Sequence, residues 1–262
     1  MKPMNAHRNR SAHGAQLGFT LVELMVAMAI GLFLVGGLIT LMGGMRRTYT
    51  TQTGLSQLQD NERVAMTLIT DVLQAAGYFP LPTTNTAQTV FPATSPFTVQ
   101  GQSIFGQPAV PASAGDTLTV RFLTNGTAAT IDADNLINCT GNTSPTAITF
   151  VNTFSVDSLT GDLVCALNGG APVHLVSGLV SMQVLYGVHT NTSLTDYSVD
   201  TYMSAAAVTA AADWLAVISV KVTLTFTNPT YGNLPGQSTT KVPQTVVFTR
   251  VIDVMNQTGV TT

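Results

Sequence analysis

The chain begins with a long apolar run. Residues 19–45 read FTLVELMVAMAIGLFLVGGLITLMGGM and contain one charged side chain, Glu23. The uncharged stretch from Leu24 to Met45 would form roughly 33 Å of helix, which is enough to cross a bilayer core of about 30 Å. A signal-peptide core has only about 7–15 apolar residues and precedes a small-residue cleavage site. We therefore expect residues 19–45 to remain in the mature protein as a transmembrane helix.

The apolar positions then follow a 3-4 helical spacing. The members of this stripe are Leu55, Leu58, Ala65, Ile69, Val72 and Ala76, widened by Leu68 and Leu73, with Glu62 as the one polar member. Gly77 suits the position directly after a helix end, and Pro80 blocks continuation. The pattern predicts one helix from Phe19 to about Ala76, packed on a domain by one face of its second half. A coiled coil is the alternative, but only about three heptads are present.

The remainder of the chain changes from irregular to β-rich. No charged residue lies between Asp71 and Asp116, and the prolines of this interval predict a long irregular connection with short extended pieces over residues 78–115. Alternation and β-branched residues then predict strands. The predicted strands are 117–123, 147–151, 161–167, 180–188, 214–227 and 242–254, with turns at 228–229 and 234–236 and a short helix at 204–212. The expected fold is α+β: a long N-terminal helix packed on an antiparallel β-sheet head over residues 116–262.

Charge is scarce and unevenly placed. Lys and Arg number 10 against 13 Asp and Glu, for a formal net charge of −3, so nothing favours nucleic-acid binding. Lys2, Arg8 and Arg10 precede the apolar run, and an acidic body follows it, which indicates an exported protein. The two cysteines, Cys139 and Cys165, fit one disulfide in an oxidising compartment.

Candidate catalytic chemistry is sparse. His174 and His189 are the only histidines beyond residue 13, and no metal-ligand spacing surrounds them. Residues 132–135, DADN, resemble part of a calcium loop but lack the spacing and closing glutamate of an EF-hand, so an Asn/Asp turn is the preferred interpretation. No GxSxG or P-loop motif occurs. The sequence therefore predicts a protein that is not an enzyme, with no cofactor and no metal.

Residues 18–27, GFTLVELMVA, resemble the class III signal of type IV prepilins and type II secretion pseudopilins. A prepilin peptidase cuts such chains after the glycine and methylates the new N-terminal residue. The resemblance thus implies a leader over residues 1–18, cleavage between Gly18 and Phe19, and N-methylation of Phe19. Glu23 occupies the position of the family's signature acid, which implies charge pairing with a new N-terminal ammonium during assembly. By physics alone, Glu23 is equally an interfacial acid at a helix start.

A second segment, residues 58–79, resembles the region after the membrane helix in PilW-type minor pilins. That region often reads Q-x-N-x-R-x-A-x-x-x-L-x-x-D-x-R-x-A-G-Y. The matching residues are Gln59, Asn61, Arg63, Ala65, Leu68, Asp71, Ala76, Gly77 and Tyr78, whereas Leu73 replaces the second arginine. For Arg63 and Asp71 we prefer a solvated or capping role in the head over contacts with other subunits.

The resemblance implies a minor pilin that takes part in assembling or priming a type IV pilus, at its tip or elsewhere, in motility or adhesion. The implied domains are a leader (1–18), a pilin helix (19–77), a connection (78–115) and a head (116–262). The implied partners are prepilin peptidase, other minor pilins, the major pilin and the inner membrane, with the head in the periplasm before assembly and on the cell surface afterwards. A J-like pseudopilin of type II secretion and a membrane-anchored adhesin are the alternatives.

Overall fold

The computed structural model describes residues 18–108, 115–130, 133–191, 198–232 and 242–256. The leader before Gly18, the predicted turn at 234–236 and Asp132 lie outside these residues. The chain divides into two compact units, one ending at Thr50 and one beginning at Thr51. The second unit holds the head and the end of the long helix.

Helix α1 spans Leu21–Gln74, close to the predicted range of residues 19–76. Its first part, up to Thr50, is exposed throughout. Its second part buries Leu58, Ala65, Met66, Ile69, Val72 and Leu73. Leu55, which the spacing assigned to the buried stripe, is 38% exposed, because the first α1 side chain buried in the head is that of Leu58.

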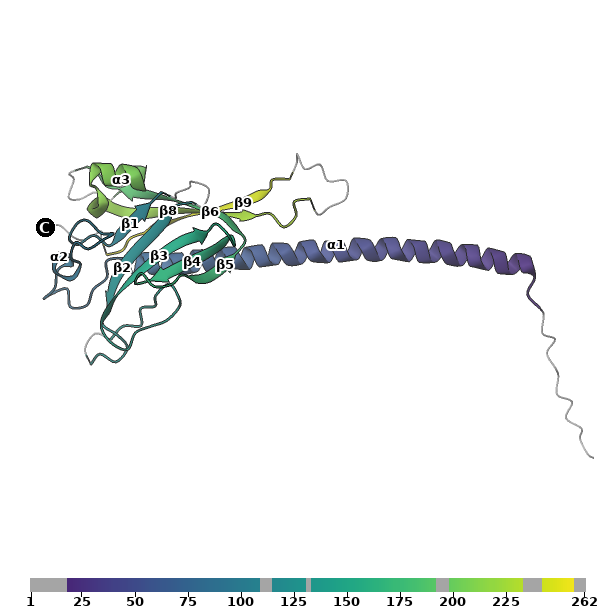
Figure 1. The fold of residues 1–262 in the computed structure, drawn as a ribbon, viewed down its shortest axis with the longest axis horizontal. Helices are drawn as coiled ribbons and strands as arrows, with labels where there is room; N and C mark the ends of the chain where they lie inside the picture. The colour runs from purple at the N-terminus through teal and green to yellow at the C-terminus, as the bar shows by residue number, and fades with distance from the viewer. Residues whose placement is uncertain (1–17, 109–114, 131–132, 192–197, 233–241, 257–262) are drawn as a thin grey trace, which may run out of the picture. The chain divides into compact units, whose positions relative to one another are not determined.

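The strands form two antiparallel sheets (Figure 1), where the sequence had suggested one. The five-stranded sheet has the order β1-β2-β3-β4-β5, and its strands are β1 (Ile104–Gln107), β2 (Thr117–Thr124), β3 (Ile148–Asp157), β4 (Asp162–Leu167) and β5 (Val173–Ser177). The four-stranded sheet has the order β7-β6-β8-β9, and its strands are β6 (Leu179–Val188), β7 (Thr201–Ser204), β8 (Val217–Thr227) and β9 (Thr245–Asp253). The fold class, α+β with a long N-terminal helix, is confirmed.

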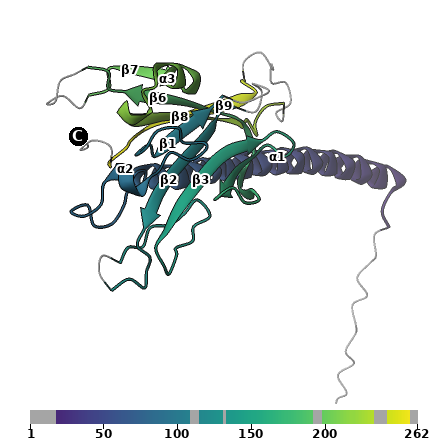
Figure 2. The ribbon, with the colours of Figure 1, turned by 60° about the vertical axis from the view of Figure 1, so that its left-hand side comes forward.

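The two sheets are joined by the chain itself and by backbone hydrogen bonds, one of which runs from the Leu179 N–H at the start of β6 to the Gly161 carbonyl between β3 and β4, at 2.8 Å. The chain passes from β5 to β6 through Gly178, whose φ of +88° is a conformation that favours glycine. Asp116 bridges the sheets at the start of β2: its backbone N–H donates to the Met182 carbonyl at 2.6 Å, and its carboxylate accepts from the Val184 N–H at 2.8 Å. Figure 2 shows the resulting two layers from a second direction.

Strands β5 and β7 and one helix were not predicted, whereas β1 is a short extended piece of the kind expected in residues 78–115. Strands β1, β5 and β7 are only four or five residues long, too short for alternation to mark them. Helix α2 (Ala87–Val90) and β1 fall inside the predicted irregular connection. Residues 214–216, predicted as strand, form a 3-10 turn before β8, whereas helix α3 (Ala205–Ala211) matches the predicted short helix.

One hydrophobic core serves the whole head. It contains the buried face of α1 and the facing side chains of both sheets. At its centre the Trp214 ring lies 5.2 Å from that of Phe105 and 5.0 Å from that of Tyr186, centroid to centroid. These rings come from the turn before β8, from β1 and from β6, so the core ties together segments that are distant in sequence.

Candidate functional site

The predicted processing site lies at the first described residues. Thr20 caps α1, since its hydroxyl accepts from the Glu23 backbone N–H at 3.3 Å. Glu23 lies in the first turn, where the positive end of the helix dipole favours an acid. The Phe19 side chain is 84% exposed. A Cβ added at Gly18 would meet no atom within 4 Å, so nothing in the described chain requires glycine there.

The apolar part of α1 is an uncovered hydrophobic surface. Helix α1 is the one described helix that is long and apolar enough to cross a membrane. An 18-residue stretch of it has a mean hydropathy of 2.5, and none of that stretch is buried. The Thr40 hydroxyl donates to the carbonyls of Gly36 and Gly37, at 2.8 and 2.9 Å. Because this polar group is satisfied within the helix, it is compatible with an apolar surrounding. The segment has the properties of a membrane anchor.

The second half of α1 is anchored by Asn61. Its side-chain amide donates to the Ser177 carbonyl at 3.0 Å, at the corner where the chain changes sheets. Arg63, in contrast, is exposed and pairs only with the exposed Asp60, at 3.5 Å. An exposed pair of this kind contributes about 0–1 kcal/mol. Of the motif residues, Asn61 is thus structural and Arg63 lies on a solvated helix face.

Ala76, Gly77 and Tyr78, near the end of the PilW-like segment 58–79, join α1 to the five-stranded sheet. Gly77 has a φ of +74° and its backbone N–H donates to the Arg121 carbonyl at 3.0 Å. Two residues further on β2, the Leu123 N–H donates to the Tyr78 carbonyl at 2.8 Å. The helix therefore ends in a left-handed residue, and the chain that follows it lies directly alongside β2.

Arg121 is a buried cation on β2 that the sequence did not single out. Its guanidinium donates to the backbone carbonyls of Gln102, Pro92 and Phe91, at 2.7, 2.9 and 3.3 Å. It also lies over the Phe97 ring, 4.1 Å from the centroid. Burial lowers the pKa of Arg121 to about 10, so the side chain still carries its charge at neutral pH. The one available signal is that Arg121 is the only lysine or arginine between Arg63 and Lys221.

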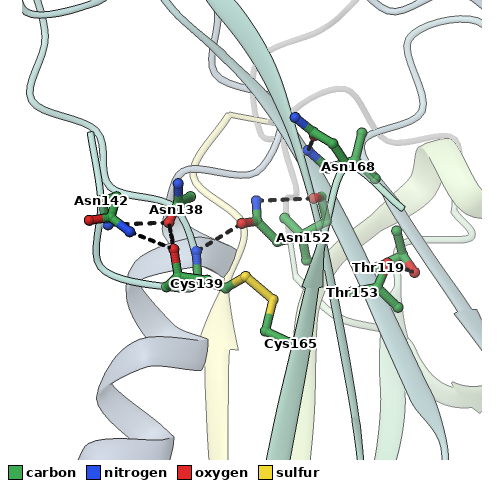
Figure 3. Close-up of a disulfide and its surroundings, with 11 residues drawn as sticks. Thr119, Asn138, Cys139, Asn142, Asn152, Thr153, Cys165 and Asn168 are labelled. Atoms are coloured by element: carbon green, nitrogen blue, oxygen red, sulfur yellow. Dashed lines mark hydrogen bonds between the residues drawn. A yellow bond between two sulfur atoms is a disulfide. The ribbon is translucent and has the colours of Figure 1, made fainter. Parts of the chain in front are cut away.

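Cys139 and Cys165 form a disulfide between the loop after β2 and strand β4 (Figure 3). Asn152 on β3 supports the loop, since its side chain accepts from the Cys139 N–H at 2.8 Å and donates to the Val120 carbonyl at 3.4 Å. Asn138 caps the same loop by accepting from backbone N–H groups. The disulfide thus fixes a loop on the sheet and has no redox partner in the described chain.

The titratable groups of the head form separate pairs. His174 lies 2.9 Å from Asp162, and His189 lies 3.8 Å from Asp200. Hydrogen bonds from the loop after β6, chiefly its backbone N–H groups, lower the pKa of Asp200. The described residues contain no group of three or more His, Cys, Asp or Glu that could hold a metal. Asp134 accepts from the Thr124 hydroxyl and from the Asn125 backbone N–H, ten and nine residues away in sequence. These bonds tie the loop to the end of β2 and are not those of the expected local Asn/Asp turn.

The predicted site residues therefore lie in separate regions. Gly18, Phe19 and Glu23 lie together at the N-terminal end of α1, whereas the disulfide belongs to the head. Sequence reasoning also missed Asn256, which donates to the carbonyls of Gln74 and Ala76, at 3.3 and 3.1 Å, and so caps the end of α1. No local signal marks such a contact, because 180 residues separate its partners.

Two family models match the chain. Residues 152–256 match type IV pilus-assembly protein W, PilW, and residues 14–39 match the prokaryotic N-terminal methylation motif. No curated protein is similar enough to count as a relative.

Among solved structures, the chain is similar to a type IV-like pilin from Thermus thermophilus, at 14% identity and a TM-score of 0.36. The similarity covers 77% of this chain and 97% of that one. At this TM-score the likeness adds nothing to the fold class, which rests on the elements described above.

Proposed function

We propose that this chain, a PilW-like minor pilin of a type IV pilus, is a non-enzymatic subunit that primes or joins pilus assembly after its leader is removed. The observation that carries the proposal is the presence of both matches in one chain, with the methylation motif at residues 14–39 and the PilW match at 152–256. The motif implies processing by a prepilin peptidase and association with other pilins.

Cleavage is proposed between Gly18 and Phe19, with methylation of Phe19. The match to the methylation motif over residues 14–39, which contains both residues, supports this assignment. The unbranched backbone of glycine would suit entry into a narrow protease cleft. The exposed Phe19 is accessible to the same enzyme.

Glu23 is proposed to pair with the N-terminal ammonium that cleavage creates. It is the only charged residue between Gly18 and Arg46, so no other side chain of the segment can offset that cation. A buried ammonium without a partner is strongly unfavourable. Pairing within the subunit or with a neighbour would favour registered entry into the fibre.

The subunit is proposed to wait in the inner membrane with its head in the periplasm and then to move into the pilus. The apolar surface of α1 supports the membrane stage. The disulfide supports an oxidising location for the head. In the fibre, the same apolar helix surface would pack against other pilin helices.

The test is mass spectrometry of the mature N-terminus of Gly18→Leu in cells that make the pilus. We expect the wild-type chain to begin at methylated Phe19 and the variant to remain an uncut precursor. Gly31→Leu is the matched control, because a Cβ at Gly31 also meets no atom within 4 Å, and it should be cut normally. Glu23→Ala should be cut and methylated but should enter fibres poorly. Normal processing of Gly18→Leu would exclude the proposed function.

A further inference from the structure

A surface cavity of about 390 Å³ lies where three segments of the head meet. Its lining includes Asp71 and Gln74 from the end of α1, Asn135 and Leu136 from the disulfide-bonded loop, and Asn256 from the segment after β9. One water molecule occupies about 30 Å³ of liquid, so the cavity has room for a whole long side chain.

The cavity is electrostatically negative. The described residues provide no hydrogen-bond or ion-pair partner for the Asp71 carboxylate, which is exposed. Helix α1 ends at Gln74, and its last turn contains no basic residue. The C-terminal end of a helix carries about half a negative charge. Among the described residues, this end of α1 is capped by the neutral amide of Asn256, and the last turn supplies no basic side chain.

The basic side chains of the described head are engaged elsewhere, and none lines the cavity. Arg63 pairs with Asp60, Arg121 is buried, Lys221 lies 6.0 Å from the ring centroid of Tyr202, and Arg250 donates to Thr70. The cavity therefore offers an unpaired carboxylate and a helix C-terminus to a cation from outside.

We propose that this cavity receives a lysine or arginine side chain from a neighbouring subunit of the same fibre. The proposal rests on the proposed function, which supplies the neighbour, and on the charge complementarity of the cavity. The amides of Gln74, Asn135 and Asn256 add carbonyl oxygens that can accept from an ammonium or guanidinium. Residues 257–262, QTGVTT, follow Asn256 directly but contain no basic side chain, so they do not match this charge.

The test is photo-cross-linking of the full chain in pilus-producing cells, with p-benzoylphenylalanine in place of Gln74 at the cavity. We expect a covalent adduct with another pilin subunit. Asp71→Asn should reduce the adduct several-fold, and Asp71→Lys should reduce it at least tenfold, because the lysine repels the incoming cation. There are two matched controls. The probe at the exposed Gln88 on α2 should give no adduct that depends on Asp71, and Asp60→Asn should leave the Gln74 adduct unchanged.

Three results would overturn the proposal: an adduct that survives Asp71→Lys, an adduct that maps to residues 257–262 of the same chain, and no adduct at all from Gln74. Formation of the Cys139–Cys165 disulfide in each variant shows that the head has folded. Cleavage after Gly18 and recovery of the chain in fibres are measured in the same cells. Loss of cleavage would refute the proposed function, whereas cleavage and assembly without an Asp71-dependent adduct would refute only the cavity's role.

Discussion

Replacing Arg121 by methionine tests whether a buried cation holds residues 91–102 on the head. The Arg121 side chain is 3% exposed and donates to three backbone carbonyls of this segment. Methionine has a similar length and can still contact the ring of Phe97, but it has no donor. The substitution therefore removes the hydrogen bonds while keeping much of the packing.

The expected change in the free energy of unfolding can be worked out from those three carbonyls. A buried carbonyl that loses its donor costs about 1–3 kcal/mol, so three of them bound the loss at about 3–9 kcal/mol. Methionine also removes the cost of burying a charge, and part of the segment can bond to water instead. We expect the free energy of unfolding of the head to fall by about 2–4 kcal/mol, or Tm to fall by roughly 5–15 °C.

The assay is urea unfolding of the full chain in detergent micelles, followed by tryptophan fluorescence. Trp214 is the only tryptophan and is 2% exposed in the core, so its emission reports unfolding of the head. Arg63→Met is the matched control, because the Arg63 side chain is 76% exposed, and it should change the free energy by less than about 0.5 kcal/mol.

Arg121→Lys tests whether the positive charge alone, without the shape of the guanidinium, stabilises the head. A single ammonium retains the positive charge but cannot reproduce the planar fork that reaches three carbonyls. We expect its stability to lie between those of the wild-type chain and Arg121→Met. If Arg121→Met unfolds at the same urea concentration as Arg63→Met, the buried guanidinium does not hold the segment and the reasoning is wrong.

Three further perturbations have defined outcomes. Gly54→Ala should destabilise the head by about 1 kcal/mol although alanine favours helix, because its Cβ would lie 2.8 Å from the Pro229 Cβ; the measurement is again urea unfolding. Replacing Cys139 and Cys165 together by serine should lower the free energy of unfolding by about 3–4 kcal/mol in the chain-entropy model, for a sequence separation of 26. Hydrogen bonds lower the pKa of Asp200, so its stabilising effect is present above the unfolded pKa of about 3.9 and is lost as pH falls through the lower folded value. The protection of the loop amides bonded to it, measured as hydrogen exchange relative to the intrinsic rate at each pH, should fall over that interval.

Matched variants set the baseline for these three measurements. Ser56→Ala, at an exposed position of the same helix, should be neutral or slightly stabilising, and a similar gain at Gly54 would contradict the clash. A reductant should destabilise the wild-type chain but not the cysteine variant. Equal destabilisation of both would show that the effect does not come from the disulfide. Asp200→Asn should exchange its loop amides rapidly at every pH, and protection equal to that of the wild-type chain would refute the role of the carboxylate.

The α1 helix and the membrane anchor were predictable because both are local. Periodicity and helix-end residues act within a few turns, so the apolar run and the 3-4 stripe placed the helix within two residues of its observed bounds. The stripe failed at Leu55 and omitted Met66, because burial also depends on where the head begins to cover the helix. The two segments that carry the resemblance, residues 18–27 and 58–79, are likewise each a continuous stretch of sequence.

The candidate site could be predicted only where its residues are neighbours in the chain. The sequence alone determined the anchor, the processing motif and the pair of cysteines that form the disulfide. The tertiary structure decided the division of the strands into two sheets, the burial of Arg121, and the cavity at Asp71 that Asn135 and Asn256 help to line. These features depend on pairing between residues as much as 182 positions apart, where the free energy of many weak long-range contacts, rather than any local preference, selects the arrangement.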